Sequence, residues 1–564
     1  MGKINIRATY FRLQQVLPVG DPELPSLPHS LTVISARLAM LNTLKSAIAG
    51  ILISLILLIA KYAVASRRPK NFPPGPPGLP VIGNLHQLPI RKAFIQQHEW
   101  TKEYGSIIGL KLGPQNVVVL NSHRHVQELF DKRGGLYSGR PENYVGGELI
   151  CPNEIHMLLA QYGAGWRTLR KSVQGLLNVA AVDALYPIQT AEATQTMCQL
   201  LDDPAGYYDH IRRYTTAVIL ASVFGQRGES FQSSKVQALY HAQDRFTAIL
   251  EPGATPPVDA FPFLKAIPEF LSPWRKEAKE VRQEQSSLYH KLLDETRERI
   301  RKGNSTSCFM EKIMDDQEKN GFSDEQVAYL GGILMEAGSD TTSSTLLIFV
   351  LAMTQHPEVL EKAQEEVDRV CGSDRSPTFD DIGKLEYLSA CMNEALRWRP
   401  IAPGGIPHML IQDDHYEGYF LPKGTILFAN TWAIHMDESE YEEPDSFIPE
   451  RFIGNKFGSK TQVTDKHRRT TYGFGAGRRV CPGQRLAENS LMLNIAKMVW
   501  LFDIKAASTA PLDVNMSSAF TDGFLVAPKK FPVEFVCRSE QRMKVIRDEL
   551  DESEKILASF GNET

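Results

Sequence analysis

A glycine-rich loop with a single cysteine precedes a helical pattern near the C-terminal end of the chain and reads Phe474-Gly475-Ala476-Gly477-Arg478-Arg479-Val480-Cys481-Pro482-Gly483. Glycines let the backbone turn tightly, proline suits the first turn of a helix, and a cysteine at a helix N-terminus is biased toward the thiolate. The alternatives are a nucleotide-binding glycine loop and a chance glycine run. The third glycine of the nucleotide-binding pattern is missing, however, and no clear strand leads into the loop. The pattern therefore favours Cys481 as a soft axial ligand of a metal.

An acid and a threonine lie side by side within a long apolar helical pattern, in Ala337-Gly338-Ser339-Asp340-Thr341-Thr342. Glycine inside a helix costs about 1 kcal/mol relative to alanine. Acid and hydroxyl groups at such a place invite a local break through which water enters the hydrogen-bond ladder. The break would open a groove next to Asp340 and Thr341, whereas the alternatives are a helix C-terminus and an exposed polar patch.

A third pattern is the pair Glu394 and Arg397, which share a helix face because they are three positions apart. Alone such a pair carries little weight, since exposed pairs of this kind are common and weak. Downstream, however, the chain reads Pro444-x-x-Phe447-x-Pro449-Glu450-Arg451-Phe452.

The cysteine loop resembles the haem-binding loop of the cytochrome P450 family. The resemblance spans about residues 70–530 and includes, in order, a proline-rich linker, W-x-x-x-R, the acid–threonine helix, E-x-x-R, the Pro444–Phe452 meander and the cysteine loop. It implies a fold that is mainly α with a minor β-sheet, and haem b (iron protoporphyrin IX) as the cofactor. Cys481 would be the axial ligand of the haem iron. Its electron density favours O–O cleavage, and neighbouring backbone N–H groups tune the sulfur.

The resemblance also implies roles for other residues. Thr341 would order water on the oxygen-binding side of the haem, and Asp340 would relay protons, so both are catalytic candidates. The haem propionates need buried donors. The candidate cofactor-binding residues are Cys481, Trp166, Arg170, His408, Arg479, Phe474, Gly475, Gly477 and Gly483. Glu394, Arg397 and Arg451 would form a structural network that supports the cysteine loop.

Hydrophobic periodicity predicts the elements that must position these residues. Apolar residues recur at three and four positions over 281–301, 326–353, 357–370, 385–398 and 487–502, which is typical of helices. Short β-branched runs at 107–112 and 117–120 indicate a minor sheet near the N-terminal end of the body.

Composition excludes several classes of protein. Of the 564 residues, 43% are hydrophobic and 23% charged, which excludes a disordered chain and a polytopic membrane protein. The formal net charge of −4 gives no global field for holding nucleic acid. Seven scattered cysteines without a C-x-x-C pair argue against a disulfide framework or a zinc knuckle, and fit a reducing compartment.

One apolar segment, 47–65, is interrupted only by Lys61 and is long enough to cross a membrane as a single helix. The alternatives are a buried core helix and a signal peptide, but 46 residues precede the run, and basic residues follow it. We therefore expect five parts, which are an unassigned N-terminal extension (1–45), a transmembrane anchor (46–65), a basic and proline-rich linker (66–80), a haem-thiolate catalytic domain (81–535) and a charged C-terminal tail (536–564).

The resemblance implies a haem-thiolate monooxygenase that inserts one oxygen atom from O2 into a small apolar substrate. Electrons would come from NADPH through a separate cytochrome P450 reductase, with cytochrome b5 as a second donor. The chain resembles fungal members of the family that act in specialised metabolism. We expect it to be anchored in the endoplasmic reticulum membrane with the catalytic domain facing the cytosol. Alternatives are desaturation, ring closure or isomerisation at the same haem, and a non-catalytic membrane-anchored haem binder. Substrate-facing segments would include 144–157, 252–273, 402–406 and 519–524, with Phe246 among the wall residues.

Overall fold

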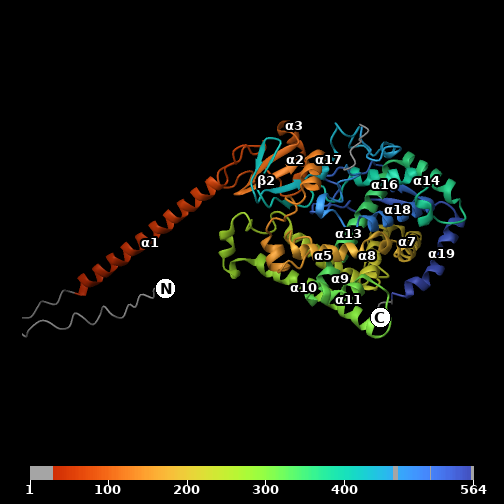
Figure 1. Cartoon of the computed structure of the whole chain (residues 1–564), viewed down its shortest axis with the longest axis horizontal. Coiled ribbons are helices and arrows are strands. Elements are labelled where there is room, and N and C mark those ends of the chain that lie inside the picture. The colour runs from red at the N-terminus through yellow and green to blue at the C-terminus, as the bar shows by residue number, and fades with distance from the viewer. Residues whose placement is uncertain (1–28, 461–467, 509, 561–564) are drawn as a thin grey trace, which may run out of the picture. The chain divides into compact units, whose positions relative to one another are not determined.

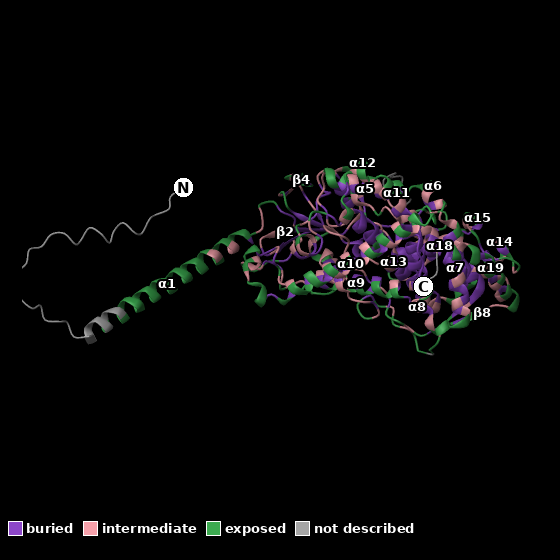
Figure 2. Cartoon of the chain, turned by 90° about the horizontal axis from the view of Figure 1, so that it is seen from below, coloured by how far each residue is buried: buried purple, intermediate pink, exposed green. Residues whose placement is uncertain are grey.

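The computed structural model describes residues 29–460, 468–508 and 510–560 (Figure 1). The chain divides into two units, Met1–Tyr62 and Ala63–Thr564. Helix α1 (His29–Ala65) contains a stretch, Arg37–Ala65, whose most apolar 18 residues have a mean hydropathy of 2.4, and none of these 18 residues is buried. Figure 2 shows most of this helix in the colour of exposed residues. It is long and apolar enough to be a candidate membrane span, as the sequence predicts. Residues 1–28 of the expected N-terminal extension lie outside the described residues.

The second unit is mainly helical, and this confirms the predicted fold class. Its helices are α2 (Ala93–Glu99), α3 (Thr101–Tyr104), α4 (His123–Val126), α5 (Ala164–Leu176), α6 (Val179–Asp183), α7 (Tyr186–Asp202), α8 (Tyr207–Phe224), α9 (Ser234–Leu250), α10 (Pro273–Arg301), α11 (Phe309–Asp315), α12 (Gln317–Asn320), α13 (Asp324–Gln355), α14 (Pro357–Cys371), α15 (Phe379–Ile382), α16 (Glu386–Trp398), α17 (Thr431–His435), α18 (Gln484–Leu501) and α19 (Glu540–Ala558). The five predicted helical segments correspond to α10, α13, α14, α16 and α18.

A small sheet has the strand order β1-β2-β6-β3. The two predicted β-branched runs form β1 (Ile107–Leu112) and β2 (Gln115–Leu120), which pair antiparallel. Strand β6 (Ile426–Ala429) runs parallel to β2, and β3 (His408–Met409) pairs antiparallel with β6. Two further strand pairs are β4 (Asp414–Tyr416) with β5 (Tyr419–Leu421), and β7 (Phe502–Ala506) with β8 (Val533–Cys537).

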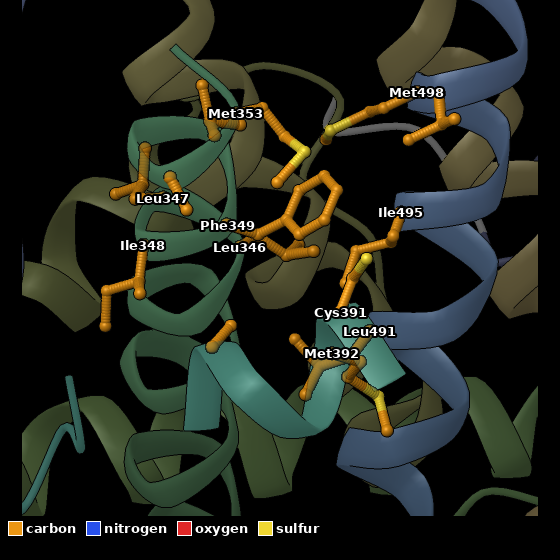
Figure 3. Close-up of a cluster of buried hydrophobic side chains, with 14 of the residues drawn as sticks. Leu346, Leu347, Ile348, Phe349, Met353, Cys391, Met392, Leu491, Ile495 and Met498 are labelled. Atoms are coloured by element: carbon orange, nitrogen blue, oxygen red, sulfur yellow. The ribbon is translucent and has the colours of Figure 1, made fainter. Parts of the chain in front are cut away.

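The core of the body forms where α13, α16 and α18 meet (Figure 3). Phe349 and Met353 of α13 lie toward Ile495 and Met498 of α18, and Cys391 of α16 lies below them. All five residues are buried. Because these three helices carry the candidate acid–threonine pair, the E-x-x-R pair and the segment that follows the cysteine loop, one core fixes the relative positions of all three motifs.

The proline-rich linker lies along the sheet rather than standing free. The guanidinium of Arg68 donates to the carbonyls of Pro73 (3.2 Å), Pro76 (3.1 Å) and Gly109 (3.0 Å). Gly109 N–H in turn donates to the Pro74 carbonyl at 2.7 Å. These bonds hold the extended linker against β1.

The residues expected to form a charged C-terminal tail contribute the end of β8 and helix α19, as far as residue 560. Ile546 and Leu557 of α19 are buried. Arg538 and Arg542 both bind the Asp368 carboxylate of α14, at 2.6 and 2.9 Å. Arg538 and Arg542 therefore pair with the body, and the buried apolar residues of α19 pack.

Candidate active site

The cysteine loop closes through its own backbone. Cys481 N–H donates to the Phe474 carbonyl at 2.8 Å, and the Gly483 amide hydrogen-bonds the Cys481 sulfur. All seven cysteines fall within the described residues, and Cys481 is the one with an exposed side chain, whereas five are buried and Cys537 is half-buried. The loop therefore presents this thiol instead of packing it as a small apolar side chain.

The electrostatics of Cys481 differ from the sequence-based expectation. Cys481 is accessible, yet the protein around it keeps bulk water away from the thiol. This desolvation raises the pKa of the thiol and outweighs the lowering by the Gly483 amide and the Arg170 charge. Helix α18 begins at Gln484, so Cys481 lies ahead of its first turn. Desolvation therefore opposes the predicted bias toward the thiolate. A coordinated metal cation removes the proton from a thiol outright, so the group remains suited to metal ligation.

Two glycines of the loop adopt backbone conformations that other residues rarely take. Gly475 has φ of +72° and Gly477 has φ of +65°. A Cβ at residue 477 would lie 2.2 Å from the carbonyl oxygen of Phe130, whereas one at residue 475 would meet no atom of the described residues within 4 Å. Gly477 N–H also donates to Asp131 Oδ1 at 2.8 Å. The loop is therefore seated directly on the Gln127–Lys132 helical turn.

Helix α13 presents a small polar face among buried residues. Ala337 is exposed and Thr341, four positions later on the same face, is half-buried. Thr341 Oγ1 donates to the Ala337 carbonyl at 2.9 Å, and Ser339 bonds the Met335 carbonyl in the same way. The helix runs unbroken from Asp324 to Gln355, so the expected local break is wrong. Hydroxyl groups here bond carbonyls one turn back and leave the helix intact.

Gly338 has a packing role. A Cβ at this position would lie 2.4 Å from Cδ1 of Ile219 in α8. The glycine therefore permits close approach of α8 to α13. The sequence-based interpretation, that it weakens the helix to open a groove, is not what the structure shows.

Asp340 faces the neighbouring helix α8. Its Oδ1 lies 3.7 Å from Nη2 of Arg212, whose guanidinium also lies 3.8 Å from the centre of the Tyr240 ring. Burial raises the pKa of Asp340, and the Arg212 charge opposes this shift. No motif marks Arg212 in the sequence. Only the packing of α8 on α13 shows that it is the cation next to Asp340.

The predicted donors Trp166, Arg170 and Arg479 come together beside the cysteine loop. Trp166 and Arg170 are buried on one face of α5, and the Arg479 guanidinium stacks 4.3 Å from the Trp166 ring centre. Arg170 Nη2 donates to the Val480 carbonyl at 2.5 Å, directly ahead of Cys481. Arg170 Nε is buried without a hydrogen-bond partner among the described residues.

His408 lies in the same region, and its ring is neutral. Its Nδ1 is 2.7 Å from the Tyr137 carbonyl, and its ring stacks on Phe130 at 4.0 Å between centres. Burial and the charges of Arg140 and Arg479 lower the pKa of His408 to about 3. Because a carbonyl only accepts, Nδ1 carries the proton of the neutral ring and Nε2 is an acceptor. Neutral His408 therefore cannot donate to a carboxylate.

A buried arginine that sequence reasoning missed, Arg140, completes the cluster. Its Nε donates to the Leu158 carbonyl at 2.9 Å, and its guanidinium also bonds the Pro407 carbonyl. Burial, together with the Arg479 charge, lowers the pKa of Arg140 to about 9. Burial and the Arg170 charge likewise lower that of Arg479, to about 10. Buried like charges favour an anion between them. No sequence signal near residue 140 identifies it, since its neighbours in the cluster are distant in the chain.

The E-x-x-R pair forms a buried network with Arg451. Arg397 binds both carboxylate oxygens of Glu394 at 2.7 Å, and Arg451 Nε donates to Oε1 at 3.1 Å. Glu394 and Arg397 are fully buried. The remaining Arg397 donors bind the carbonyls of His435 (3.0 Å), Pro444 (2.8 Å) and Ser446 (3.1 Å). The network ties α16 to the segment that leads toward the cysteine loop.

Most of the chain, residues 73–535, matches the family model of cytochrome P450. The chain belongs to the cytochrome P450 family. Among its relatives are cytochrome P450 monooxygenase patH of Penicillium expansum (38% identical, covering 89% of this chain and 95% of the relative), atE of Aspergillus terreus (37%, 91% and 96%) and yanC of Aspergillus niger (38%, 90% and 97%). This protein is accordingly an oxidoreductase with P450 monooxygenase activity. The resemblance to the cytochrome P450 family that the motifs indicate is confirmed.

The residues of the candidate site fit the haem that the cytochrome P450 family implies. An exposed thiol stands at one side of the site, at Cys481. Three arginines with pKa values below the ordinary one, of which Arg170 has an unpartnered Nε, supply donors for carboxylates. A soft ligand beside buried donors for anions is the set that an iron porphyrin with two propionates requires.

Proposed function

We propose that this P450 inserts one oxygen atom from O2 into a small, largely apolar organic molecule of specialised metabolism. The observation that carries the proposal is the thiol of Cys481, exposed and hydrogen-bonded by the Gly483 amide within a loop fixed on α18 and on the Gln127–Lys132 turn. When bound, the haem would supply the iron at which dioxygen is activated. Cys481 would hold that iron through its sulfur, with Gly483 N–H tuning the sulfur.

Arginines would hold the propionates of the haem. Arg479 stacks on Trp166, and Arg170 is buried on the same face of α5 as Trp166. We add Arg140 to this set because it is buried in the same cluster and pairs with no carboxylate among the described residues. His408 would contribute a donor only once a propionate has raised its pKa enough for Nε2 to take up a proton. The guanidinium groups therefore carry most of the anion binding.

Asp340 and Thr341 would move and position protons. Thr341 Oγ1 already donates to the Ala337 carbonyl, so its lone pairs remain available to water on the exposed face of α13. Asp340 lies on the neighbouring face of the same turn, beside Arg212. A proton taken up at the Asp340 carboxylate can then pass through one water to the Thr341 hydroxyl.

The Glu394–Arg397–Arg451 network would support the cysteine loop without touching the substrate. Phe474, Gly475 and Gly477 would shape that loop for the haem. We propose five parts for the chain. They are an extension (1–45), whose residues 29–45 already belong to helix α1, an anchor (46–65), a linker (66–80), a catalytic domain (81–535) and a C-terminal segment (536–564) that contains the docked helix α19.

Electrons would arrive from NADPH through a separate reductase, with cytochrome b5 as a second donor. Acidic partners would be attracted by Arg478 of the cysteine loop and by Arg167 and Lys171 of α5. We place the anchor α1 in the endoplasmic reticulum membrane and the body in the cytosol, because Arg67, Arg68 and Lys70 follow the apolar run.

The axial ligand is tested by spectroscopy of the full-length holoprotein. The reduced, CO-bound wild type should show the red-shifted Soret band of thiolate ligation, and Cys481→His should lose it. Cys537→Ser, which changes the half-buried cysteine, is the matched control and should keep the band. A Cys481→His protein that keeps the red-shifted band would overturn the assignment.

The reaction type is tested by comparing metabolites of hosts with and without the gene. Loss of the gene should accumulate a compound that is one oxygen atom lighter than the missing product. A precursor and product that differ by two hydrogens, or only by rearrangement, would replace the proposed oxygen insertion with desaturation, ring closure or isomerisation.

A further inference from the structure

A buried carboxylate that the proposed function does not use lies beside the acid–threonine turn. Glu336 of α13 accepts hydrogen bonds at Oε1 from Gln285 Nε2 (2.9 Å) and from the Tyr289 hydroxyl, both on α10. Burial and the Glu336 charge raise the pKa of Tyr289, so this hydroxyl keeps its proton and donates. The other oxygen, Oε2, lies 3.7 Å from Nε2 of His156, which is beyond hydrogen-bond distance.

His156 is buried with both ring nitrogens unpartnered among the described residues. It is 3% exposed, and its ring stacks on Phe246 with centres 5.5 Å apart. Leaving buried polar atoms without partners costs about 1–3 kcal/mol for each group. Native proteins rarely accept that cost unless a water or ligand fills the place. The gap between His156 Nε2 and Glu336 Oε2 can be bridged by one polar atom at hydrogen-bond distance from both.

This pair adjoins the candidate active site. Glu336 immediately precedes Ala337, whose side chain is exposed on the face shared with Thr341. His156 begins a segment held by the candidate propionate donors, because Arg140 binds the Leu158 carbonyl and Arg479 binds the Ala160 carbonyl, at 2.9 and 2.8 Å. The segment that begins with His156 is thus fastened to the candidate site, and Glu336, held by α10, adjoins the exposed face of α13.

We propose that Glu336 and His156 form a polar anchor for a hydroxyl group of the substrate, an otherwise apolar phenol or alcohol. The hydroxyl would donate to Glu336 Oε2 and accept from His156 Nε2–H. This inference rests on the proposed oxygen insertion and names its substrate class. Phe246, stacked on His156, would contact the apolar part of the substrate next to the hydroxyl.

The chemistry of the pair selects a hydroxyl over other groups. A substrate carboxylate would be repelled by Glu336. An ammonium would have to donate to both atoms, which forces the His156 proton onto Nδ1 and leaves a buried N–H without an acceptor. With a hydroxyl, the imidazole proton sits on Nε2 and is donated to the hydroxyl oxygen. The nitrogen left without a partner is then Nδ1, which is an acceptor. Unsatisfied buried donors are rarer in proteins than unsatisfied acceptors.

The test is spin-state titration of the holoenzyme with pairs of probes in which a methyl replaces the hydroxyl. Suitable pairs are 4-ethylphenol with 4-ethyltoluene, 2-naphthol with 2-methylnaphthalene, and 4-phenylphenol with 4-methylbiphenyl. We expect the hydroxyl member of at least one pair to bind about tenfold more tightly, the effect of a hydrogen bond to a charged acceptor. Glu336→Gln and His156→Phe should each reduce this ratio to about threefold or less.

Ser343→Ala is the matched control on the same helix, because within the described part of the chain this buried hydroxyl bonds only helix carbonyls. It should leave the ratio unchanged. Each variant is first checked for the red-shifted CO band, with His156→Gln replacing His156→Phe if that variant fails to load haem. A wild type that shows the band but no hydroxyl preference in any pair overturns the anchor alone, as does a preference that survives in both variants. A wild type without the band overturns the proposed function instead.

Discussion

Oδ1 of Asp340 in α13 lies 3.7 Å from Nη2 of Arg212 in α8, and this pairing sets the electrostatics of the candidate proton relay. Burial raises the pKa of Asp340, the Arg212 charge lowers it and the Asp244 charge raises it. Arg212 is itself held over the Tyr240 ring. The relay therefore has one neighbour that favours the carboxylate and one that favours the acid.

Replacing these two neighbours should move the same titration in opposite directions. Arg212→Met removes the cation, so Asp340 should take up its proton at higher pH than in the wild type. The acidic limb of the pH profile of product formation should then shift to higher pH, and product formed per NADPH consumed should fall about two- to fivefold at neutral pH. Asp244→Asn removes an anion, so its acidic limb should shift to lower pH. Shifts of the same sign in both variants would contradict the proposed role of Asp340.

Loss of the buried carboxylate of Glu394 should destabilise the Glu394–Arg397–Arg451 network that supports the cysteine loop. Glu394→Ala leaves Arg397 and Arg451 without their shared anion, and breaking a buried pair costs about 3–5 kcal/mol. We expect a large drop in the urea midpoint and little haem incorporation. The control is Lys362→Ala, which removes an exposed ion pair to Glu450 of 2.6 Å and should cost less than about 1 kcal/mol. Equal losses of stability in both variants would mean that the buried network contributes no more than an exposed ion pair.

Much of the fold could be predicted from hydrophobic periodicity. The pattern predicts α10, α13 and α18. Helix α10 buries one face against its neighbours, whereas α13 and α18 are buried on most sides over much of their length. Motifs also identify Cys481, Glu394 and Arg397, since their spacing is local. Local spacing places Trp166 and Arg170 on one face of α5 for the same reason, and the structure has both buried there.

Relationships between distant segments could not be predicted in this way. Arg140 and Arg212 have no local signature, and their importance appears only when packing brings them to Arg479 and Asp340. The glycine at 338 carries a local signal that admits two explanations, and only the 2.4 Å approach of Ile219 shows that close packing is the correct one. The same limit applies to α19, whose charges suggest a solvated tail until its partner Asp368 is seen.

Two glycines of the cysteine loop provide a matched pair of alanine substitutions. Both have positive φ, so each alanine should cost about 1–2 kcal/mol from the left-handed conformation. Gly477→Ala adds a clash of 2.2 Å with the Phe130 carbonyl, whereas Gly475→Ala meets open space. We expect Gly475→Ala to keep most of the red-shifted CO band and Gly477→Ala to lose most of it. Loss of the band to the same extent in both proteins would show that backbone conformation, and not seating on Phe130, decides the loop geometry.

The buried histidines should make the protein unstable in mild acid, and His435 provides the clearest case. Its Nδ1 donates to the Arg397 carbonyl at 3.1 Å, while the Tyr472 amide donates to Nε2 at 3.2 Å, so both nitrogens are committed to the neutral ring. Burial and the Arg397 charge lower the pKa of His435 from 6.5 to about 3. Between these values the unfolded chain binds a proton that the folded chain does not. The free energy of unfolding therefore falls as the pH drops below 6.5, by about 1.4 kcal/mol per pH unit for one such proton.

His435→Asn should reduce this dependence, because asparagine keeps a donor for the Arg397 carbonyl and does not titrate. Urea unfolding, followed by tryptophan fluorescence at several pH values between neutral and mildly acidic, should give a slope smaller by up to about 1.4 kcal/mol per pH unit than in the wild type. His408, which is also buried and neutral, should account for part of the slope that remains. The exposed His415 serves as the control, and His415→Asn should leave the slope unchanged. If His435→Asn and the wild type lose stability equally steeply, protonation at residue 435 does not contribute to acid unfolding, and the sensitivity to acid must come from other groups.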